Sequence, residues 1–207
     1  QMNLFEDKLL DVNHKQDYRI IGQLFDTYWL IEFEDSFYMM DQHAAHEKIL
    51  YERLMKQFHE KTYHSQMIMP PVILTLSLRE EQILKENWKT FTALGYEIEE
   101  FGGKEYKVTG LPAELPTVID CKQLLIELID TIADESATHD PERITEKVAS
   151  MSCKAAVKGN NRLSFKEAEE LMRELMEAEN PYNCPHGRPT LIKMTKYEIE
   201  RKFKRIL

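Results

Sequence analysis

The sequence predicts an α+β fold in two lobes, in which an antiparallel-sheet-and-helix lobe is interrupted by an inserted α/β lobe. Three observations support this prediction. Aromatic and aliphatic runs typical of strands occupy residues 18–40. Helical repeats that begin at capping boxes then alternate with strand-like runs. Pro70-Pro71 and the polar residues 136–140 mark the two ends of the insertion.

The composition fits a packed core and excludes a membrane span. Hydrophobic residues make up 43% of the 207 residues. No apolar run approaches the roughly 18 residues that a membrane helix needs, so we expect a soluble, cytoplasmic protein with no membrane partner. The net charge of -9 disfavours independent DNA binding, because that affinity rests on Lys and Arg neutralising phosphates. Three cysteines do not make a disulfide framework.

The first lobe begins with three strands that lead into a helix. Residues 1–17 are polar, and we expect them to form a disordered or linker entry. The strand-like runs, separated by turns, are residues 18–25, 28–33 and 37–40. Helical periodicity follows over about residues 44–59. This pattern predicts an antiparallel meander followed by an amphipathic helix.

The insertion, residues 70–135, has its own strands and helices. A strand is predicted at 72–76, and the capping box that begins at Ser77 starts a helix that Gly95 ends. A hairpin covers 96–110, and Asp120 caps a further helix to about Ala133. We find no cluster of chemically active side chains in this stretch.

The first lobe resumes over residues 136–207. Pro141 favours a helix start, and that helix runs through Cys153 to about residue 158. Ser164 begins a second capped helix, and a strand is predicted at 190–194. A last helix follows the capping box at Thr195 and, counting Lys196, carries five Lys or Arg.

A candidate metal site lies where the third strand meets the first helix. Asp41 and His43 point to one side of extended backbone, and His43 and Glu47 are four residues apart on a helix. These three side chains therefore converge, with Glu52 a further turn along behind them. His46 is a fourth metal-capable residue here. The alternative is that histidines at a helix start are surface or capping residues.

A second set of candidate ligands lies far along the chain. Cys184 and His186, in a turn rich in Pro and Gly, offer a thiolate and an imidazole. Their spacing alone is not the paired pattern of zinc sites. Cys153 is a third candidate, with core filling as its alternative, and we assign Cys121 to core filling alone.

The mixed ligands limit the choice of metal. Thiolate and imidazole favour Zn²⁺, whereas carboxylate and imidazole also suit Mn²⁺ or Mg²⁺. Without His46, six candidate ligands remain, which exceed the four of a closed tetrahedral site. The surplus favours an open or two-metal site of the kind that hydrolyses phosphoesters.

These residues resemble the motifs of the C-terminal domain of MutL mismatch-repair proteins. The stretch DQHAAHEKILYE, from Asp41 to Glu52, is similar to that family's endonuclease motif DQHA-x2-E-x4-E. Ser152-Cys153-Lys154 resembles its ACR-type motif, with Ser and Lys in place of Ala and Arg. CPHGRP occurs from Cys184 to Pro189, and Phe203-Lys204-Arg205 resembles the terminal FxR motif. The four motifs point to a bacterial MutL of the nicking type.

The resemblance implies an endonuclease domain that nicks one strand of duplex DNA during mismatch repair. Its homodimerising lobe would comprise residues 18–69 and 136–207, and residues 70–135 would form an external, regulatory lobe. Mn²⁺, or Mg²⁺, would activate the domain, and Zn²⁺ would be structural or regulatory. The implied metal ligands, of which the first three would be catalytic, are Asp41, His43, Glu47, Cys153, Cys184 and His186. Arg188 would meet a phosphate through its planar fork or, alternatively, brace the turn.

The resemblance also implies partners. They are a second copy of the chain, duplex DNA bound weakly by this domain alone, the DNA polymerase sliding clamp, MutS, and the family's ATPase domain, whose ATP-binding motif does not occur here. Association with the nucleoid would accompany activity. The family's clamp motif, Gln-x-x-Ile/Leu-x-Pro, corresponds to residues 65–70, where Ser65 replaces the Gln. Gln66 offers a shifted register with Ile68 and Pro70.

Two other classes of protein use similar residues. A zinc-stabilised dimerisation module without catalysis would use the same Cys and His residues but needs no open coordination position. Metal titration distinguishes it from a nuclease, which binds a further cation. A thiol-based redox protein is disfavoured because no Cys-x-x-Cys occurs.

Overall fold

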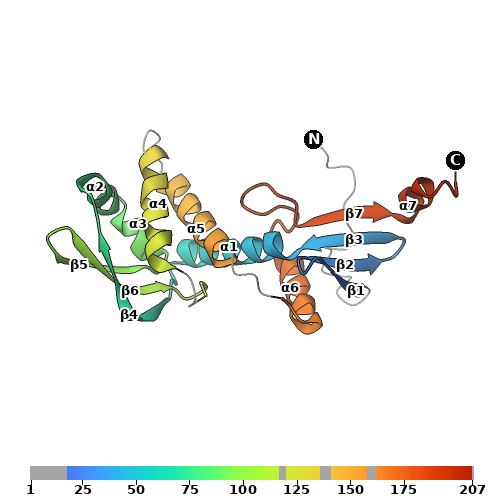
Figure 1. Ribbon diagram of the computed structural model, residues 1–207, viewed down its shortest axis with the longest axis horizontal. Coiled ribbons are helices and arrows are strands. Elements are labelled where there is room, and N and C mark those ends of the chain that lie inside the picture. Colours follow the sequence, from blue (N-terminus) through green and yellow to red (C-terminus); the bar gives the residue numbers. More distant parts are fainter. Residues whose placement is uncertain (1–17, 117–119, 136–140, 158–161, 207) are drawn as a thin grey trace. The chain divides into compact units, whose positions relative to one another are not determined.

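The computed structural model describes residues 18–116, 120–135, 141–157 and 162–206, and its helices and antiparallel sheets confirm the α+β fold (Figure 1). The expected entry segment 1–17 and the loop at 136–140 lie outside these residues. The chain divides into two compact units. The first unit comprises Gln1–Ile49 and Gly159–Leu207, and the second unit comprises Leu50–Lys158. No helix in the described part of the chain is long and apolar enough to cross a membrane.

The first unit is built on a four-stranded antiparallel sheet in the order β1-β2-β3-β7 (Figure 1). Its strands are β1 Arg19–Leu24, β2 Tyr28–Phe33, β3 Ser36–Asp41 and β7 Leu191–Thr195. The predicted meander is therefore confirmed. In the register of β3 with β7, Met40 faces Leu191, and the amide of Asp41 donates a hydrogen bond of 2.9 Å to the carbonyl of Thr190. This register places the end of β3 beside the segment that leads into β7.

One face of this sheet forms the core of the first unit. Side chains alternate along β2, so that Trp29, Ile31 and Phe33 are all buried on one side. They pack against helix α6, Phe165–Glu177, and against Ala45 and Ile49 of helix α1, Gln42–Glu60. The predicted capping box at Ser164 starts α6, whose apolar stripe faces the sheet.

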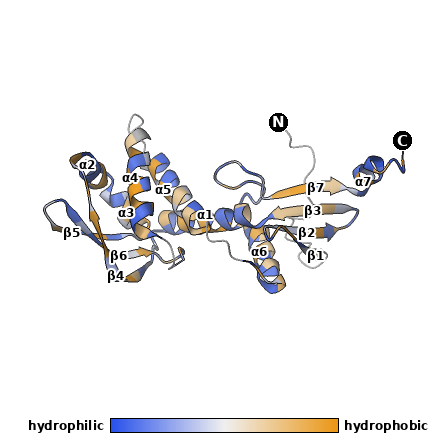
Figure 2. Cartoon of the chain, viewed as in Figure 1, coloured by the Kyte–Doolittle hydropathy of each residue, from blue (hydrophilic) through white to orange (hydrophobic). Residues whose placement is uncertain are grey.

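The second face of the sheet is also apolar. In the pairing register, Leu30 faces Met39 and Met39 faces Ile192, so the three side chains share that face. Phe37 faces Met194 in the next row. None of these residues belongs to a buried core cluster, and Ile192 is 52% exposed. Figure 2 shows hydrophobic colour on β3 and β7 and hydrophilic colour on helix α7, Lys196–Lys202.

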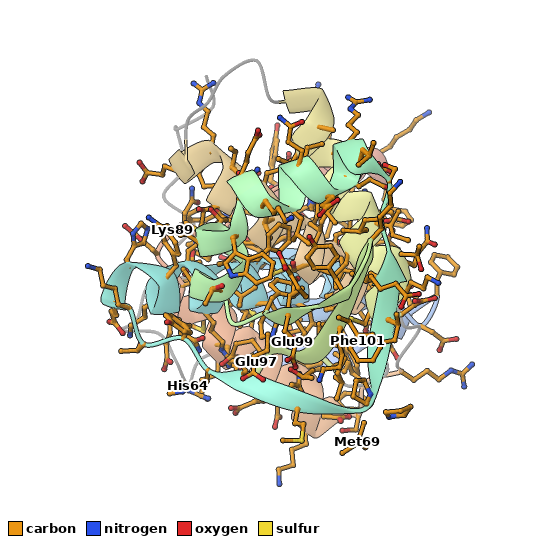
Figure 3. All side chains as sticks on the ribbon, turned by 90° about the vertical axis from the view of Figure 1, so that its left-hand side faces the viewer. His64, Met69, Lys89, Glu97, Glu99 and Phe101 are labelled. Atoms are coloured by element: carbon orange, nitrogen blue, oxygen red, sulfur yellow. The ribbon has the colours of Figure 1, made fainter. Side chains whose placement is uncertain are left out.

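The second unit contains a three-stranded antiparallel sheet in the order β4-β6-β5. The strands are β4 Ser65–Thr75, β5 Glu97–Gly102 and β6 Glu105–Pro112, and the predicted hairpin is confirmed in β5 and β6. Figure 3 shows β4 running along the sheet, with Met69 on β4 and Glu97, Glu99 and Phe101 on β5.

Pro70-Pro71 was predicted to separate the two lobes, but it lies inside β4. The strand tolerates two prolines because it is an edge strand and because its pairing with β6 is irregular between Met67 and Val72. Residues 65–67 pair with β6 as well, so they belong to the second unit. The units therefore differ in their bounds from the expected lobes, 18–69 with 136–207 and 70–135.

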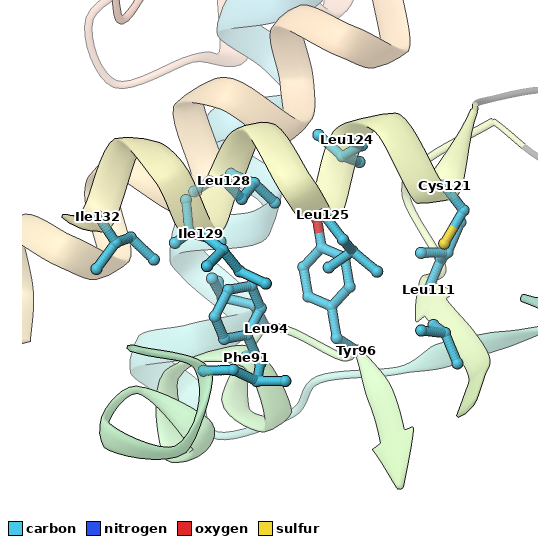
Figure 4. Packing of buried hydrophobic residues seen from close by; sticks show 14 of the residues in the cluster. Phe91, Leu94, Tyr96, Leu111, Cys121, Leu124, Leu125, Leu128, Ile129 and Ile132 are labelled. Atoms are coloured by element: carbon cyan, nitrogen blue, oxygen red, sulfur yellow. The ribbon is translucent and has the colours of Figure 1, made fainter. Parts of the chain in front are cut away.

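Helices cover the sheet of the second unit. They are α2 Leu78–Glu86, α3 Trp88–Ala93, α4 Cys121–Glu135 and α5 Pro141–Val157. The single helix predicted after Ser77 is divided at Asn87, whose side chain donates to the carbonyl of Ile83 and so ends α2. Figure 4 shows apolar side chains of α4, such as Leu125, directed at Tyr96. The buried hydroxyl of Tyr96 lies 2.6 Å from the Ser152 hydroxyl of α5.

Candidate metal centre

Asp41 ends β3, and helix α1 begins at the next residue. Its Oδ1 accepts hydrogen bonds from the amides of His43, at 2.9 Å, and Ala44, at 3.2 Å. Asp41 therefore caps the first turn of α1. The prediction that His43 lies in extended backbone is wrong, because α1 starts before it. His43 Nδ1 nevertheless lies 3.9 Å from the same Asp41 oxygen.

Gln42 has a structural role that the sequence did not indicate. It is 2% exposed, and its Oε1 accepts hydrogen bonds from Gln23 Nε2, at 3.1 Å, and Trp29 Nε1, at 3.2 Å. Its Nε2 donates to the carbonyl of Asp26 at 3.1 Å. One buried amide thus joins the β1–β2 hairpin to the start of α1. The only signal in the sequence was an amide between two candidate ligands.

A tight turn presents the Cys-x-His pair. The amide of Cys184 donates to the carbonyl of Arg188 at 2.8 Å, and the amide of Gly187 donates to the carbonyl of Cys184 at 2.9 Å. Gly187 has a φ of 78°, a backbone conformation that is unfavourable for residues with a Cβ. These bonds fix the thiol, the imidazole of His186 and the guanidinium of Arg188 on one short loop.

Three of the predicted ligands come together within the first unit. Glu47, Cys184 and His186 each offer one ligand atom, and these atoms lie within 4.8 Å of one another. His186 Nδ1 lies 3.2 Å from Glu47 Oε2, although 139 residues separate the two in the sequence. Glu47 and Cys184 are buried, whereas His186 is exposed. Among the described residues, no other set of three His, Cys, Asp or Glu side chains brings its ligand atoms this close together.

Arg188 completes the surroundings of Glu47. Its Nη2 donates a hydrogen bond of 2.5 Å to the same Oε2 that His186 approaches. The Glu47 side chain is only 5% exposed, and a buried carboxylate is costly unless a positive charge compensates it. The bond to Glu47 raises the pKa of the Arg188 guanidinium further above its usual range, and Cys184 adds to that shift. A cation and the guanidinium would therefore compete for one oxygen.

The donor set fits a divalent metal ion. A thiolate, an imidazole and a carboxylate are the ligand types that Zn²⁺ binds in proteins. Asp41 and His43 lie one turn before Glu47 on the same strand-helix junction, outside the group of three. These residues could add the oxygen and nitrogen donors that Mn²⁺ accepts.

The remaining predicted residues lie in the second unit. Glu52 is on the later part of α1, and Cys153 is fully buried on α5 within the core of this unit. Cys121, assigned to core filling, is also buried there, and burial raises the pKa of its thiol to about 11. Gln66 Nε2 donates to the carbonyls of Pro112, at 3.0 Å, and Leu115.

Ile68 and Pro70, the other residues of the shifted clamp motif, line a pocket of about 510 Å³. Met67 and Met69 also line it, and both are strongly exposed, at 75% and 80%. The amide of Gln66 is thus held inside the second unit, whereas the methionines beside it face solvent.

Comparison with known proteins identifies the family. A family model described as the MutL C-terminal dimerisation domain matches residues 21–163. The chain belongs to this family. The matched region of the MutL domain includes Asp41, Glu47 and Cys153 and ends before Cys184.

Relatives extend the similarity over nearly the whole domain. The chain is 52% identical over 203 residues to the DNA mismatch repair protein MutL of Agathobacter rectalis, covering 98% of this chain and 31% of that protein. It is 39% identical over 200 residues to the MutL of Caldanaerobacter subterraneus subsp. tengcongensis, covering 97% of this chain and 33% of the relative. It is 36% identical over 213 residues to the MutL of Clostridium tetani, covering 99% of this chain and 34% of that protein. The chain therefore spans about a third of the length of these MutL proteins.

The role of Gln42 predicts a loss of stability in Gln42→Ala. Removing a buried side chain that makes three hydrogen bonds leaves donors and acceptors without partners, which costs about 1–3 kcal/mol of unfolding free energy for each buried group. Urea denaturation followed by circular dichroism measures the change. Gln82→Ala is the matched control, since Gln82 is exposed on α2 and bonds only Glu86 among the described contacts. Equal midpoints for both variants would contradict the role.

The cluster of Glu47, Cys184 and His186 predicts thiolate coordination of a divalent cation. Titration with Co²⁺, a spectroscopic substitute for Zn²⁺, should produce a thiolate-to-cobalt charge-transfer band that Cys184→Ser weakens or abolishes. Cys121→Ala is the control and should retain the band, because Cys121 lies in the core of the second unit. A band of undiminished intensity in Cys184→Ser would exclude this thiol as a ligand. The same titration of Cys153→Ser tests the ligand that the family resemblance implies.

Proposed function

We propose that this MutL C-terminal domain is the homodimeric, metal-dependent endonuclease domain of a mismatch-repair protein and nicks one strand of duplex DNA. The observation that carries the proposal is the assembly of Glu47, Cys184 and His186 within 4.8 Å of one another. Two of the motifs that resemble the nicking type of MutL supply these three residues. The relatives' name, DNA mismatch repair protein MutL, supports the pathway.

The residues of this group have distinct tasks in the proposed reaction. A divalent cation, Mn²⁺ for activity and Zn²⁺ for structure or regulation, would polarise a phosphate and lower the pKa of water. Glu47 supplies the carboxylate, with Asp41 and His43 as further catalytic ligands. Once a cation neutralises Glu47, Arg188 no longer compensates that carboxylate. Its guanidinium fork can then bind phosphate oxygens of the substrate.

We assign the homodimer interface to the second face of the first unit's sheet. Leu30, Phe37, Met39, Ile192 and Met194 form this face, and both core clusters exclude them. A contiguous apolar surface of this kind marks a protein interface. The family description, a dimerisation domain, supports a second copy of the chain as the occupant.

A zinc-stabilised dimerisation module without catalysis is the second candidate. One observation favours it: Cys184 and His186 are ligands typical of structural zinc, and the close group does not include Asp41 or His43. A module of this kind would bind one Zn²⁺ per chain tightly and no Mn²⁺ in a subsequent titration. A nuclease would bind Mn²⁺ in addition.

Recruitment to DNA would depend on partners. The chain's overall net charge of -9 gives little electrostatic attraction to the phosphate backbone. We propose the ATPase domain of the family, MutS and the sliding clamp for this task. Clamp binding through the shifted motif requires Gln66 to give up its bonds to Pro112 and Leu115. The exposed Met67 and Met69 beside it need no such change.

Glu47→Ala tests the endonuclease. Since Glu47 is the carboxylate of the close group, its loss should abolish Mn²⁺-dependent nicking of supercoiled plasmid while the dimer remains intact. The matched control is Glu60→Ala, which removes an exposed carboxylate from the other end of α1. Gel electrophoresis of the relaxed plasmid measures the rate, and light scattering measures the dimer. Full nicking activity in Glu47→Ala would refute the assignment.

Ile192→Glu tests the interface. A buried charge in the centre of an apolar interface is strongly unfavourable, so this variant should be monomeric at micromolar concentrations. Leu78→Glu, at a site that is 70% exposed on α2, is the control and should remain dimeric. Size-exclusion chromatography with light scattering gives the mass of each. A dimeric Ile192→Glu variant would place the interface elsewhere.

A further inference from the structure

The C-terminal segment of the first unit differs in charge from the rest of the chain. Residues 193–205 contain six Lys or Arg and two Glu, a net charge of +4, whereas the whole chain carries -9. The two glutamates do not offset the local excess. Glu198 is engaged at the start of α7, where the amide of Thr195 donates to it at 2.7 Å, and Glu200 is only partly exposed.

Five basic side chains of this segment, none of which is Lys193, form no ion pair with the described residues. Elsewhere, cations such as Arg19, Lys107 and Arg162 each lie within 4.0 Å of a carboxylate. No carboxylate of the described residues comes that close to the cations of the C-terminal basic surface. This surface consists of Lys196, Arg201, Lys202, Lys204 and Arg205, all exposed. Unpaired, solvated charges of one sign on one short segment create a positive potential.

The backbone holds the C-terminal basic surface in a fixed shape. The amide of Lys204 donates to the carbonyl of Arg201, at 3.0 Å, and the amide of Arg205 donates to that of Glu200, at 2.9 Å. This pair of bonds is the Schellman pattern that ends helices, usually with glycine at the position of positive φ. Here Lys204 adopts that conformation, with a φ of 55°. A lysine therefore occupies a position where glycine would adopt the backbone conformation with less strain.

Two aromatic side chains lie among these charges. Tyr197 is 56% exposed and Phe203 is 72% exposed, and both are on or directly after α7. Lys and Arg clustered along one short segment are the electrostatic footprint of a nucleic-acid-binding surface, whereas aromatic rings add stacking only with unpaired bases. Figure 2 shows α7 as a hydrophilic helix at the end of the hydrophobic β7.

β7 sets the distance between this surface and the candidate metal centre. The centre's turn, Cys184 to Arg188, precedes β7, and α7 follows it. β7 has five residues. At a rise of about 3.3 Å per residue, it is about 17 Å long. Phosphates of one DNA strand are spaced about 3.4 Å along the duplex axis, so the two ends of β7 are about five base pairs apart.

We propose that the C-terminal basic surface binds the phosphate backbone of duplex DNA about five base pairs from the strand position at the metal centre. The choice of duplex DNA rests on the proposed nicking function. The surface would align the substrate without reading its sequence, since phosphate contacts carry no base information. A purely structural role is the alternative, in which these cations complement the C-terminal dipole of α7.

The slope of binding against salt concentration tests this proposal. Fluorescence anisotropy of a labelled duplex with the 207-residue chain, in EDTA so that no cleavage occurs, gives log K against log salt. Each lost phosphate contact should reduce the magnitude of the slope by about 0.9. Neutralising four basic side chains should therefore reduce it by up to about 3.6. The neutralised variant carries Arg201→Gln, Lys202→Gln, Lys204→Gln and Arg205→Gln.

The matched control removes the same charge from the second unit, through Lys56→Gln, Lys89→Gln, Lys104→Gln and Lys122→Gln, all exposed. It should keep the wild-type slope. Lys204→Gly removes one contact and retains the backbone, so its slope should fall by about 0.9 without loss of thermal stability. Equal slopes for the neutralised and control variants, or no binding by the wild type at low salt, would overturn the proposal. Binding in EDTA is measured apart from nicking, so failure of the endonuclease assignment would be seen separately in the Glu47→Ala assay.

Discussion

The buried carboxylate of Glu47 is the constraint on which the candidate site depends. With 5% of its side chain exposed, Glu47 requires a positive charge at close range, which Arg188 supplies, and His186 approaches the same oxygen. Both partners come from a turn that precedes β7. The turn can reach Glu47 because β7 pairs with β3 in a register that sets Thr190 beside Asp41. Sheet register and the electrostatics of one side chain are therefore linked.

The same sheet divides the proposed functions between its two faces. One face is covered by α6 and the first part of α1 and holds the metal-site junction in place. The other is apolar, lies outside both cores and is suited to a second copy of the chain. Gln42 connects these elements, because its amide bonds reach both the β1–β2 hairpin and the indole of Trp29. A motif residue with no evident chemistry thus has a role in positioning the ligands around it.

Much of this was predictable from the sequence, for identifiable reasons. The strands of the meander and the helices with capping boxes at Ser77, Ser164 and Thr195 were found because their signals are local. Glu47, Cys184 and His186 were predicted as candidate ligands by residue type and family resemblance, and the structure brings their ligand atoms close together. The start of α1, the break at Asn87 and the strand through Pro70 were not, because side-chain caps and edge-strand pairing decide them. The contact of Arg188 with Glu47 was missed because sequence spacing does not reveal pairing across 141 residues.

The separation of the ligands along the chain has a consequence for biosynthesis. The N-terminal hairpins can form as soon as β1 to β3 leave the ribosome, since their contacts are local. Glu47 has no contact with Arg188 until the second unit and the turn at Cys184 have been synthesised. A chain that terminates before Cys184 lacks both the thiol turn and the Arg188 guanidinium, so a prematurely ended product retains Asp41 to Glu47 without the rest of the candidate metal centre. Completion of synthesis is therefore a precondition for assembly of the site.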